Sequence, residues 1–158
     1  MPNSNQERDR IYQALRDKAY RLLARREQST CELRRKLKID EYPHLVDQLL
    51  GELIGQGAQS DFRFAEQLCR SRYQNGKGPV KLRYELNQHQ IEESVVAEVM
   101  SDYDDKWLNL AIEVRQKKFG SKAPGNYKDW AKQARFLQQR GFAPDQIEPY
   151  IDLPETSM

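Results

Sequence analysis

The sequence predicts an all-α protein, and three observations support that fold class. The 158 residues include sixteen Leu, fifteen Gln and eleven Ala, but only six Val and two Thr. Straight-chain side chains lose little rotamer freedom in a helix, whereas strands favour β-branched residues. No stretch alternates apolar and polar residues with the period of a strand. Caps and helix-breaking residues divide the chain at intervals that indicate nine short helices.

The N-terminal part of the chain is expected to form three helices. The first covers about residues 7–26, where apolar side chains recur on one stripe. Ser29, followed three residues later by Glu32, matches a capping box that opens a short second helix. Pro43 stands where the first turn of a third helix tolerates proline, and Gly55 marks the end of that helix.

The same order of helical segments recurs twice along the rest of the chain. Each time, caps, glycines and prolines separate apolar stripes of helical spacing. The expected segments are a helix from its cap Asp61 through Tyr73; a helix opened by Pro79 with Val80, Leu82 and Leu86; a stripe from Ile91 to Val99; a helix after Asp104 and Asp105 that ends at Phe119; a helix over about 129–140 stopped by Gly141; and a last helix opened by Pro144 with Ile147, Tyr150 and Ile151.

An internal repeat groups these helices into three modules. Ala19, Ala65 and Ala111 stand 46 residues apart each time. An apolar residue follows each of them at the third position and a basic residue at the seventh. Such self-similarity is typical of stacked helical modules. The sequence therefore predicts three-helix modules at residues 1–58, 59–103 and 104–158.

The charged residues follow the same repeat. Three stretches, 1–39, 62–90 and 106–143, carry net charges of +6, +4 and +7, whereas the stretches between and after them carry acids and no Lys or Arg. The formal net charge of +2 therefore hides basic first and second helices and acidic third helices. A basic stripe of this kind is suited to a polyanion such as nucleic acid. A protein partner that presents both signs fits equally well.

The sequence carries no signature of an enzyme, a metal site or a cofactor. It lacks a complete phosphate-binding loop, and its two histidines, His44 and His89, are isolated from each other and from the cysteines. Cys31 and Cys69 lie in helical patterns, where each is expected to be a small buried side chain. With two cysteines, no secretory signal, no membrane-spanning run and no heptad seam, the chain is expected to be a cytoplasmic monomer.

Most aromatic residues fall on apolar stripes and are expected in the core. Tyr73 and Tyr84 differ, because Arg72 and Arg83 flank them, and a tyrosine beside a cation is suited to stacking on an exposed base. The expected core aromatics are Phe64, Trp107, Trp130, Phe136 and Phe142.

Several segments of the sequence form an ordered set of motifs. The central ones are Asp61-Phe62-Arg63-Phe64-Ala65-Glu66, then Arg70-Ser71-Arg72, then Gly78-Pro79-x-x-Leu82-Arg83-x-Glu85-Leu86. The flanking ones are Leu23-Ala24-Arg25-Arg26-Glu27-Gln28-Ser29-x-x-Glu32-Leu33-Arg34-Arg35-Lys36-Leu37 and Arg135-Phe136-Leu137-x-x-Arg140-Gly141-Phe142. In this order and spacing, over about residues 10–151, they resemble the RecX family, whose members regulate the RecA recombinase.

The resemblance implies three tandem three-helix modules, similar to helix-turn-helix units, in an elongated and curved arrangement. It further implies a non-enzymatic protein that binds the RecA filament on single-stranded DNA, with weak or non-specific contacts to DNA itself. Such a protein lowers the ATPase, strand-exchange and coprotease activities of RecA and so acts on DNA repair, recombination and the SOS response. Two stretches depart from the family pattern: Gly57-Ala58-Gln59-Ser60, where apolar residues usually follow the glycine, and His89-Gln90, where Lys-Gly is usual.

The candidate contacts with RecA or DNA are basic residues of the first two helices of each module, and the sequence does not divide them between the two partners. The acidic third helices could face away from DNA, pair with basic patches on RecA, or neutralise neighbouring modules. The alternative functions are a helix-turn-helix-type DNA-binding protein that acts without RecA and an adaptor that binds only protein. The candidate residues are Arg25, Arg26, Arg34, Arg35, Arg70, Arg72, Lys77, Lys81, Arg83, Lys117, Lys118, Lys132, Arg135 and Arg140.

Overall fold

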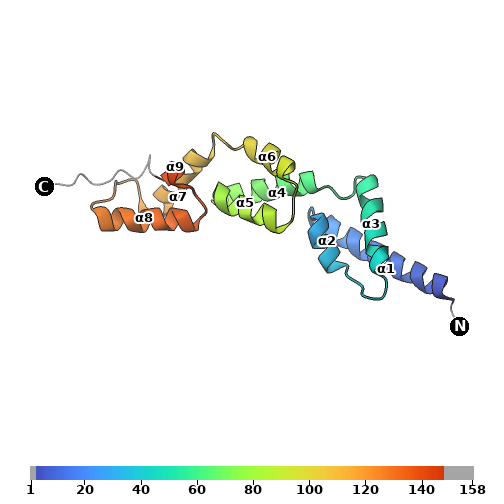
Figure 1. Cartoon of the computed structure of the whole chain (residues 1–158). Helices are drawn as coiled ribbons and strands as arrows, with labels where there is room; N and C mark the ends of the chain where they lie inside the picture. Colours follow the sequence, from blue (N-terminus) through green and yellow to red (C-terminus); the bar gives the residue numbers. More distant parts are fainter. Residues whose placement is uncertain (1–2, 148–158) are drawn as a thin grey trace. The chain divides into compact units, whose positions relative to one another are not determined.

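The computed structural model of the chain describes residues 3–147, and within them it contains nine α-helices and no strand (Figure 1). This confirms the all-α fold class and the expected order of helices; Tyr150 and Ile151 lie outside the described residues. The helices are α1 (Ser4–Arg25), α2 (Thr30–Lys36), α3 (Pro43–Gly55), α4 (Asp61–Gln74), α5 (Pro79–Gln88), α6 (Glu93–Ser101), α7 (Trp107–Phe119), α8 (Tyr127–Gln139) and α9 (Pro144–Ile147).

The helices belong to two compact units, and each unit packs around its own core. The first unit takes in residues up to 67 together with 89–91, and the second takes in 68–88 and the described residues from 92 onward. Helix α4 therefore begins in the first unit and ends in the second. In the described part of the chain, no helix has the length and apolar character that a membrane crossing requires.

The first unit is built on the apolar face of α3. Five α3 side chains are buried, and α1 and α2 pack against them, because their own apolar stripes face the same core. Ala19, Ala65 and Ala111, the residues that define the sequence repeat, are all buried to within 1% of full burial. The core of the first three helices consists of Leu15, Ala19, Leu33, Leu37, Leu45, Val46, Leu49, Leu50 and Leu53.

The capping box at the start of α2 is confirmed and carries an ion pair as well. Ser29 Oγ accepts from the Glu32 backbone N–H (3.0 Å), and Glu32 Oε1 accepts from the Ser29 N–H (3.2 Å). Arg26 donates to both Glu32 oxygens, at 2.9 and 2.6 Å, and Lys36 lies 3.5 Å away. Burial raises the pKa of the Glu32 carboxyl, but the hydrogen bond and charge of Arg26, the charge of Lys36 and the Ser29 N–H outweigh it and hold that pKa below its usual value.

The link before α4 shows why one expected cap is wrong. Ser60, not Asp61, caps α4: Ser60 Oγ accepts from the Arg63 N–H at 3.2 Å. The Asp61 carboxylate instead accepts from the Thr30 N–H (2.9 Å) at the start of α2 and from Gln59 Nε2 (2.9 Å). Gln59, which stands where the family usually has an apolar residue, is buried with both of its amide protons used, since it also donates to the backbone of the α1–α2 loop (3.1 Å).

The second unit packs α5 against α6 and joins α7, α8 and α9 around a second core. Leu82, Leu86, Leu137 and Phe142 are each at least 98% buried. Two expectations about burial are wrong. Val80 is 56% exposed because it lies on the outer side of the first turn of α5, and Cys31 of the first unit is half-buried rather than buried.

Three helices end in the same way, with a residue in the left-handed region just beyond the helix. After α3, α4 and α8 this residue is Gly57, Gly76 or Gly141, and the next N–H bonds back to the carbonyl five residues earlier, which is the Schellman motif. After α5 the corresponding residue is Gln90, with φ +56°. This is the position where the family usually has glycine.

The end of α8 lies directly against the start of α5. The Gly78 N–H donates to the Arg140 carbonyl (2.8 Å), and the Val80 N–H donates to the Gly141 carbonyl (2.9 Å). A Cβ at Gly78 would lie 2.4 Å from the Gly141 carbonyl oxygen, so this approach requires a residue without a side chain.

We predict that Gly78→Ala lowers the free energy of unfolding by about 1–3 kcal/mol, because the new methyl group meets backbone that cannot move aside. Urea denaturation followed by circular dichroism measures it. Gly125→Ala is the matched control: a Cβ there meets no atom within 4 Å, and its φ is not positive, so its effect stays within about 1 kcal/mol. Equal effects of the two variants would contradict the close approach.

We predict that Gln90→Gly raises the free energy of unfolding by about 0.5–1 kcal/mol. A non-glycine residue in the left-handed region costs about 1–2 kcal/mol, and the entropy of glycine in the unfolded chain offsets part of that gain. Gln88→Gly, at the last residue of α5, is the control with the opposite sign, since glycine in a helix is unfavourable. A destabilised Gln90→Gly would show that the Gln90 side chain contributes more than its backbone strain costs.

We predict that Glu32→Gln keeps the capping box but lowers stability by about 1–2 kcal/mol at pH 7, because Arg26 loses a charged acceptor. The folded-state pKa of Glu32 is depressed, so its contribution is present above the unfolded pKa of about 4.3 and is lost as pH falls through the folded value. The difference between wild type and variant therefore narrows below about pH 4. A pH-independent difference in urea denaturation would contradict this assignment.

Candidate functional site

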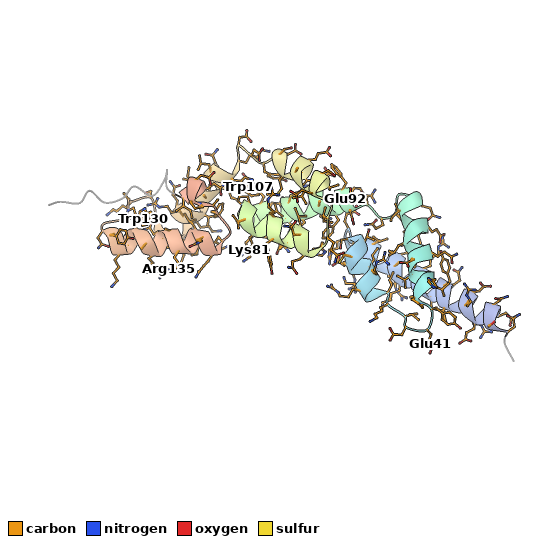
Figure 2. The ribbon with its side chains drawn as sticks, viewed as in Figure 1. Glu41, Lys81, Glu92, Trp107, Trp130 and Arg135 are labelled. Atoms are coloured by element: carbon orange, nitrogen blue, oxygen red, sulfur yellow. The ribbon has the colours of Figure 1, made fainter. Side chains whose placement is uncertain are left out.

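The second unit brings four of the predicted cations together. Arg72 lies in the last turn of α4, Lys77 in the loop that follows, Lys81 in the first turn of α5 (labelled in Figure 2), and Arg140 at the C-terminal cap of α8. The backbone bonds from Gly78 and Val80 to the end of α8 hold these segments together. We call Arg72, Lys77, Lys81 and Arg140 the cationic cluster.

The electrostatics of the cluster favour an anion. The pKa of Lys77 is lowered first by burial and then by the charges of Arg140, Lys81 and Arg72, while Glu85 opposes the shift. Glu85 already accepts from Arg72 Nε at 2.6 Å, so one carboxylate faces four cations. A phosphate or carboxylate placed here would relieve the repulsion that Lys77 experiences.

Arg140 is fixed in place by contacts on both sides. Its guanidinium lies 5.2 Å from the centre of the Phe136 ring, and Nη1 is 3.5 Å from the Asn75 carbonyl oxygen. Lys118 Nζ lies over the same Phe136 ring at 5.8 Å. Lys117, Lys118 and Arg140 border a cleft of about 540 Å³ between the end of α4 and α7–α8. The candidates of α7 therefore extend the positive surface of the cluster.

The other candidates of the second unit lie apart from this cluster in their contacts. Arg83 is paired with Glu93 at 2.9 Å, and Arg70 is exposed on α4. Lys132 and Arg135 are exposed on α8 and border a different hollow, which also includes Tyr127.

The candidates of the first unit are divided between internal pairs and open surface. Arg26 is bound to Glu32, and Arg34 to Asp47 of α3. Arg25 and Arg35 are exposed and, in the part of the chain that the structure describes, form no ion pair. Arg34 and Arg35 border a cleft of about 700 Å³, but acidic residues border it too, so its charge is mixed.

Acids of the third helices are used inside their own modules. Asp47 of α3 binds Arg34, and Glu93 of α6 binds Arg83. Glu52 of α3 accepts from the Tyr12 hydroxyl and lies 3.5 Å from an arginine of α1; burial and then this hydrogen bond raise the pKa of Tyr12 to about 12. Of the three interpretations of the acidic helices, neutralisation is the one these contacts favour, although the partners lie in the same module rather than in a neighbouring one.

The aromatic residues differ from expectation in three places. Tyr73 packs with Tyr103 and Trp107, with ring centres 5.3 and 5.8 Å apart, so it belongs to an internal cluster rather than to an open surface. Trp130 is only partly buried, as is Phe136.

The sequence reasoning also missed an exposed aromatic pair. Tyr127 is 67% exposed and stacks on Trp130. The signal available in the sequence was the three-residue spacing of these two aromatics, which places them on one face of a helix, among lysines. Tyr84, by contrast, is exposed as its assignment requires.

Comparison with known proteins places the chain in a family. Models of the first, second and third three-helix domains of RecX match residues 16–53, 60–100 and 104–151. The regulatory protein RecX of Halorhodospira halophila is 41% identical over 136 residues, which cover 85% of this chain and 84% of that protein. The protein of the same name from Legionella pneumophila is 40% identical, over 83% of this chain and 88% of its own length.

Solved structures share the fold. The crystal structure of RecX from Lactobacillus salivarius superimposes with a TM-score of 0.75 at 19% identity, over 90% of this chain and 96% of that one. A second crystal structure, of a regulatory protein RecX, gives 0.76 at 18% identity, over 95% and 79%. With three matching domain models in order and relatives about 40% identical over most of their length, the chain belongs to the RecX family.

Proposed function

We propose that this protein is a non-enzymatic, cytoplasmic regulator that binds the RecA filament on single-stranded DNA and lowers the ATPase, strand-exchange and coprotease activities of RecA. Membership of the RecX family supports a regulatory role. Within this chain, the observation that carries the proposal is the cationic cluster. Its four cations come from the α4 end, the following loop, α5 and α8, and a single carboxylate faces them.

The cluster suits a filament because its cations are positioned before binding. The close backbone approach of the α5 start to the α8 end fixes Lys81 and Arg140, and the Schellman turn after α4 fixes Lys77. Holding like charges together costs free energy, and an anionic partner recovers it on binding. A nucleoprotein filament presents phosphates and acidic side chains repeatedly, so several basic surfaces on one chain can engage it multivalently.

We predict that the double variant Lys77→Gln/Lys81→Gln needs at least about tenfold more protein to inhibit the single-stranded-DNA-dependent ATPase of RecA, because each charged hydrogen bond contributes about 1.5–3 kcal/mol. Glutamine keeps most of each stem. Arg72 and Arg83 are less suitable targets, since each holds an internal ion pair. The matched control is Lys106→Gln/Lys122→Gln, which removes two exposed lysines of the same unit.

Repeating the titration at several salt concentrations separates the partners of the cluster. Contacts with phosphate lower the log–log salt slope by about one unit per lysine removed, whereas contacts with RecA side chains leave it closer to the wild-type value. Equal inhibition by the cluster variant, the control and the wild type would refute the assignment of the cluster. A wild-type chain that binds DNA without affecting the ATPase would instead favour a DNA-binding protein that acts without RecA.

A further inference from the structure

The first turns of α8 carry an exposed aromatic pair beside a group of cations. Tyr127 and Trp130 stack with ring centres 5.7 Å apart and planes inclined by 24°, and Tyr127 is 67% exposed. Figure 2 labels Trp130 and Arg135 on this helix. The pair was not predicted from the sequence, and the cationic cluster does not include it.

Three cations lie on the same exposed side of the helix. Lys128, Lys132 and Arg135 are exposed, and the spacings of four and three residues stack them along one face. The face carrying Tyr127 lies next to them, because consecutive residues are 100° apart around a helix. In the described part of the chain, none of the three cations forms an ion pair.

The only acid that borders this surface is directed to the backbone of the preceding loop. Asp129 Oδ2 accepts from the Gly125 N–H (3.3 Å) and lies 3.5 Å from Gln133 Nε2. Because that carboxylate is engaged, it does little to neutralise the lysines. Within the described residues, the surface is lined by Asn126, Tyr127, Lys128, Asp129, Ala131, Lys132 and Arg135 around a hollow of about 820 Å³.

A buried arginine holds this surface rigid from beneath. Arg115 of α7 is 5% exposed; it donates to Gln133 Oε1 of α8 (2.9 Å) and to the carbonyl of Lys122 in the α7–α8 loop (2.6 Å). Asn126 caps α8 by accepting from the Asp129 N–H at 2.8 Å. The loop and the first turn of α8 are thus fixed to α7, so the aromatic pair is positioned before any ligand binds.

We propose that Tyr127 and Trp130, with Lys128, Lys132 and Arg135, form a base-stacking site for single-stranded DNA. An unpaired base stacks on the open face of Tyr127, and the cations contact the phosphates on either side. A base inside a duplex does not offer its face, so the site selects single strands. The inference goes beyond the proposed function, because the site acts on a free strand with no RecA present.

The chemistry of the surface favours a single strand over an acidic peptide. Carboxylates would engage the lysines but would leave the tyrosine ring exposed to water. A single strand offers both groups at once, with a π face on every base and a negative charge on every phosphate. The ring and the cations are therefore both used only by a nucleic acid.

The test is fluorescence anisotropy of labelled oligothymidylate, an abasic oligomer of the same length, and a duplex of that length, each with the full chain and no RecA. Tyr127→Ala is expected to weaken binding to oligothymidylate about tenfold, the loss of one stacked base. Tyr127→Phe keeps the ring and is expected to bind as the wild type does. Tyr84→Ala, at a tyrosine of α5 that is 64% exposed, is the matched control and is expected to change nothing.

The abasic oligomer separates stacking from phosphate contact. Wild type and Tyr127→Ala are expected to bind it equally, whereas Lys128→Gln/Lys132→Gln lowers the salt slope on both single strands by about two units. Unchanged binding of oligothymidylate by Tyr127→Ala, an equal loss on the abasic oligomer, or tighter binding of the duplex would each overturn the proposal. Since RecA is absent, none of these outcomes bears on inhibition of its ATPase.

Discussion

Two backbone hydrogen bonds determine how the second unit presents its charges. The Gly78 N–H to Arg140 carbonyl bond and the Val80 N–H to Gly141 carbonyl bond join the start of α5 to the end of α8. They require glycine on both sides, because a Cβ at Gly141 would lie 2.4 Å from the Cβ of Lys81. Residues more than fifty positions apart are thereby placed side by side. The cationic cluster exists only because the second and third helical groups meet at this point.

A comparable joint in the first unit shows that such sharing is general in this fold. The loop between α1 and α2 is bonded to Gln59 and Asp61, and Ser29 Oγ lies 2.8 Å from His89 Nδ1, whose ring packs on Phe64 at 4.6 Å. Groups of three short helices bury too little surface to be stable alone. The polar link and His89 supply the contacts that complete the core, although both stretches depart from the usual family sequence.

The features that could be predicted from the sequence are the local ones. The capping box at Ser29, the proline that opens α3 and the repeated buried alanines each depend on residues a few positions apart, so the pattern identifies them directly. The cap of α4 was misassigned to Asp61 because Ser60 and Asp61 are both suited to capping, and only the tertiary partner Thr30 decides between them.

The assembly of the candidate site lay beyond sequence reasoning for the same physical reason. Arg72 and Lys77 are neighbours of Arg140 only through the close approach at Gly78, which no local pattern encodes. The pairing of Arg72 with Glu85, and of Lys118 with the Phe136 ring, likewise depends on how two helices cross. The exposed ring of Tyr127 depends on which face of α8 meets α7.

The charge repeat itself has a largely internal explanation. The cation at the repeated position binds the second helix of its own module each time: Arg26 binds Glu32, Arg72 binds Glu85, and Lys118 lies over Phe136. Charges in phase with a helical repeat therefore arise from a conserved packing geometry within the chain and are not by themselves a sign of a polyanion. Lys77, Lys81 and Lys132 lie outside that repeated position and have no ion pair in the described residues. The charges that stabilise the modules and those left for a partner are thus different residues, which is why a partner can bind without disturbing the fold.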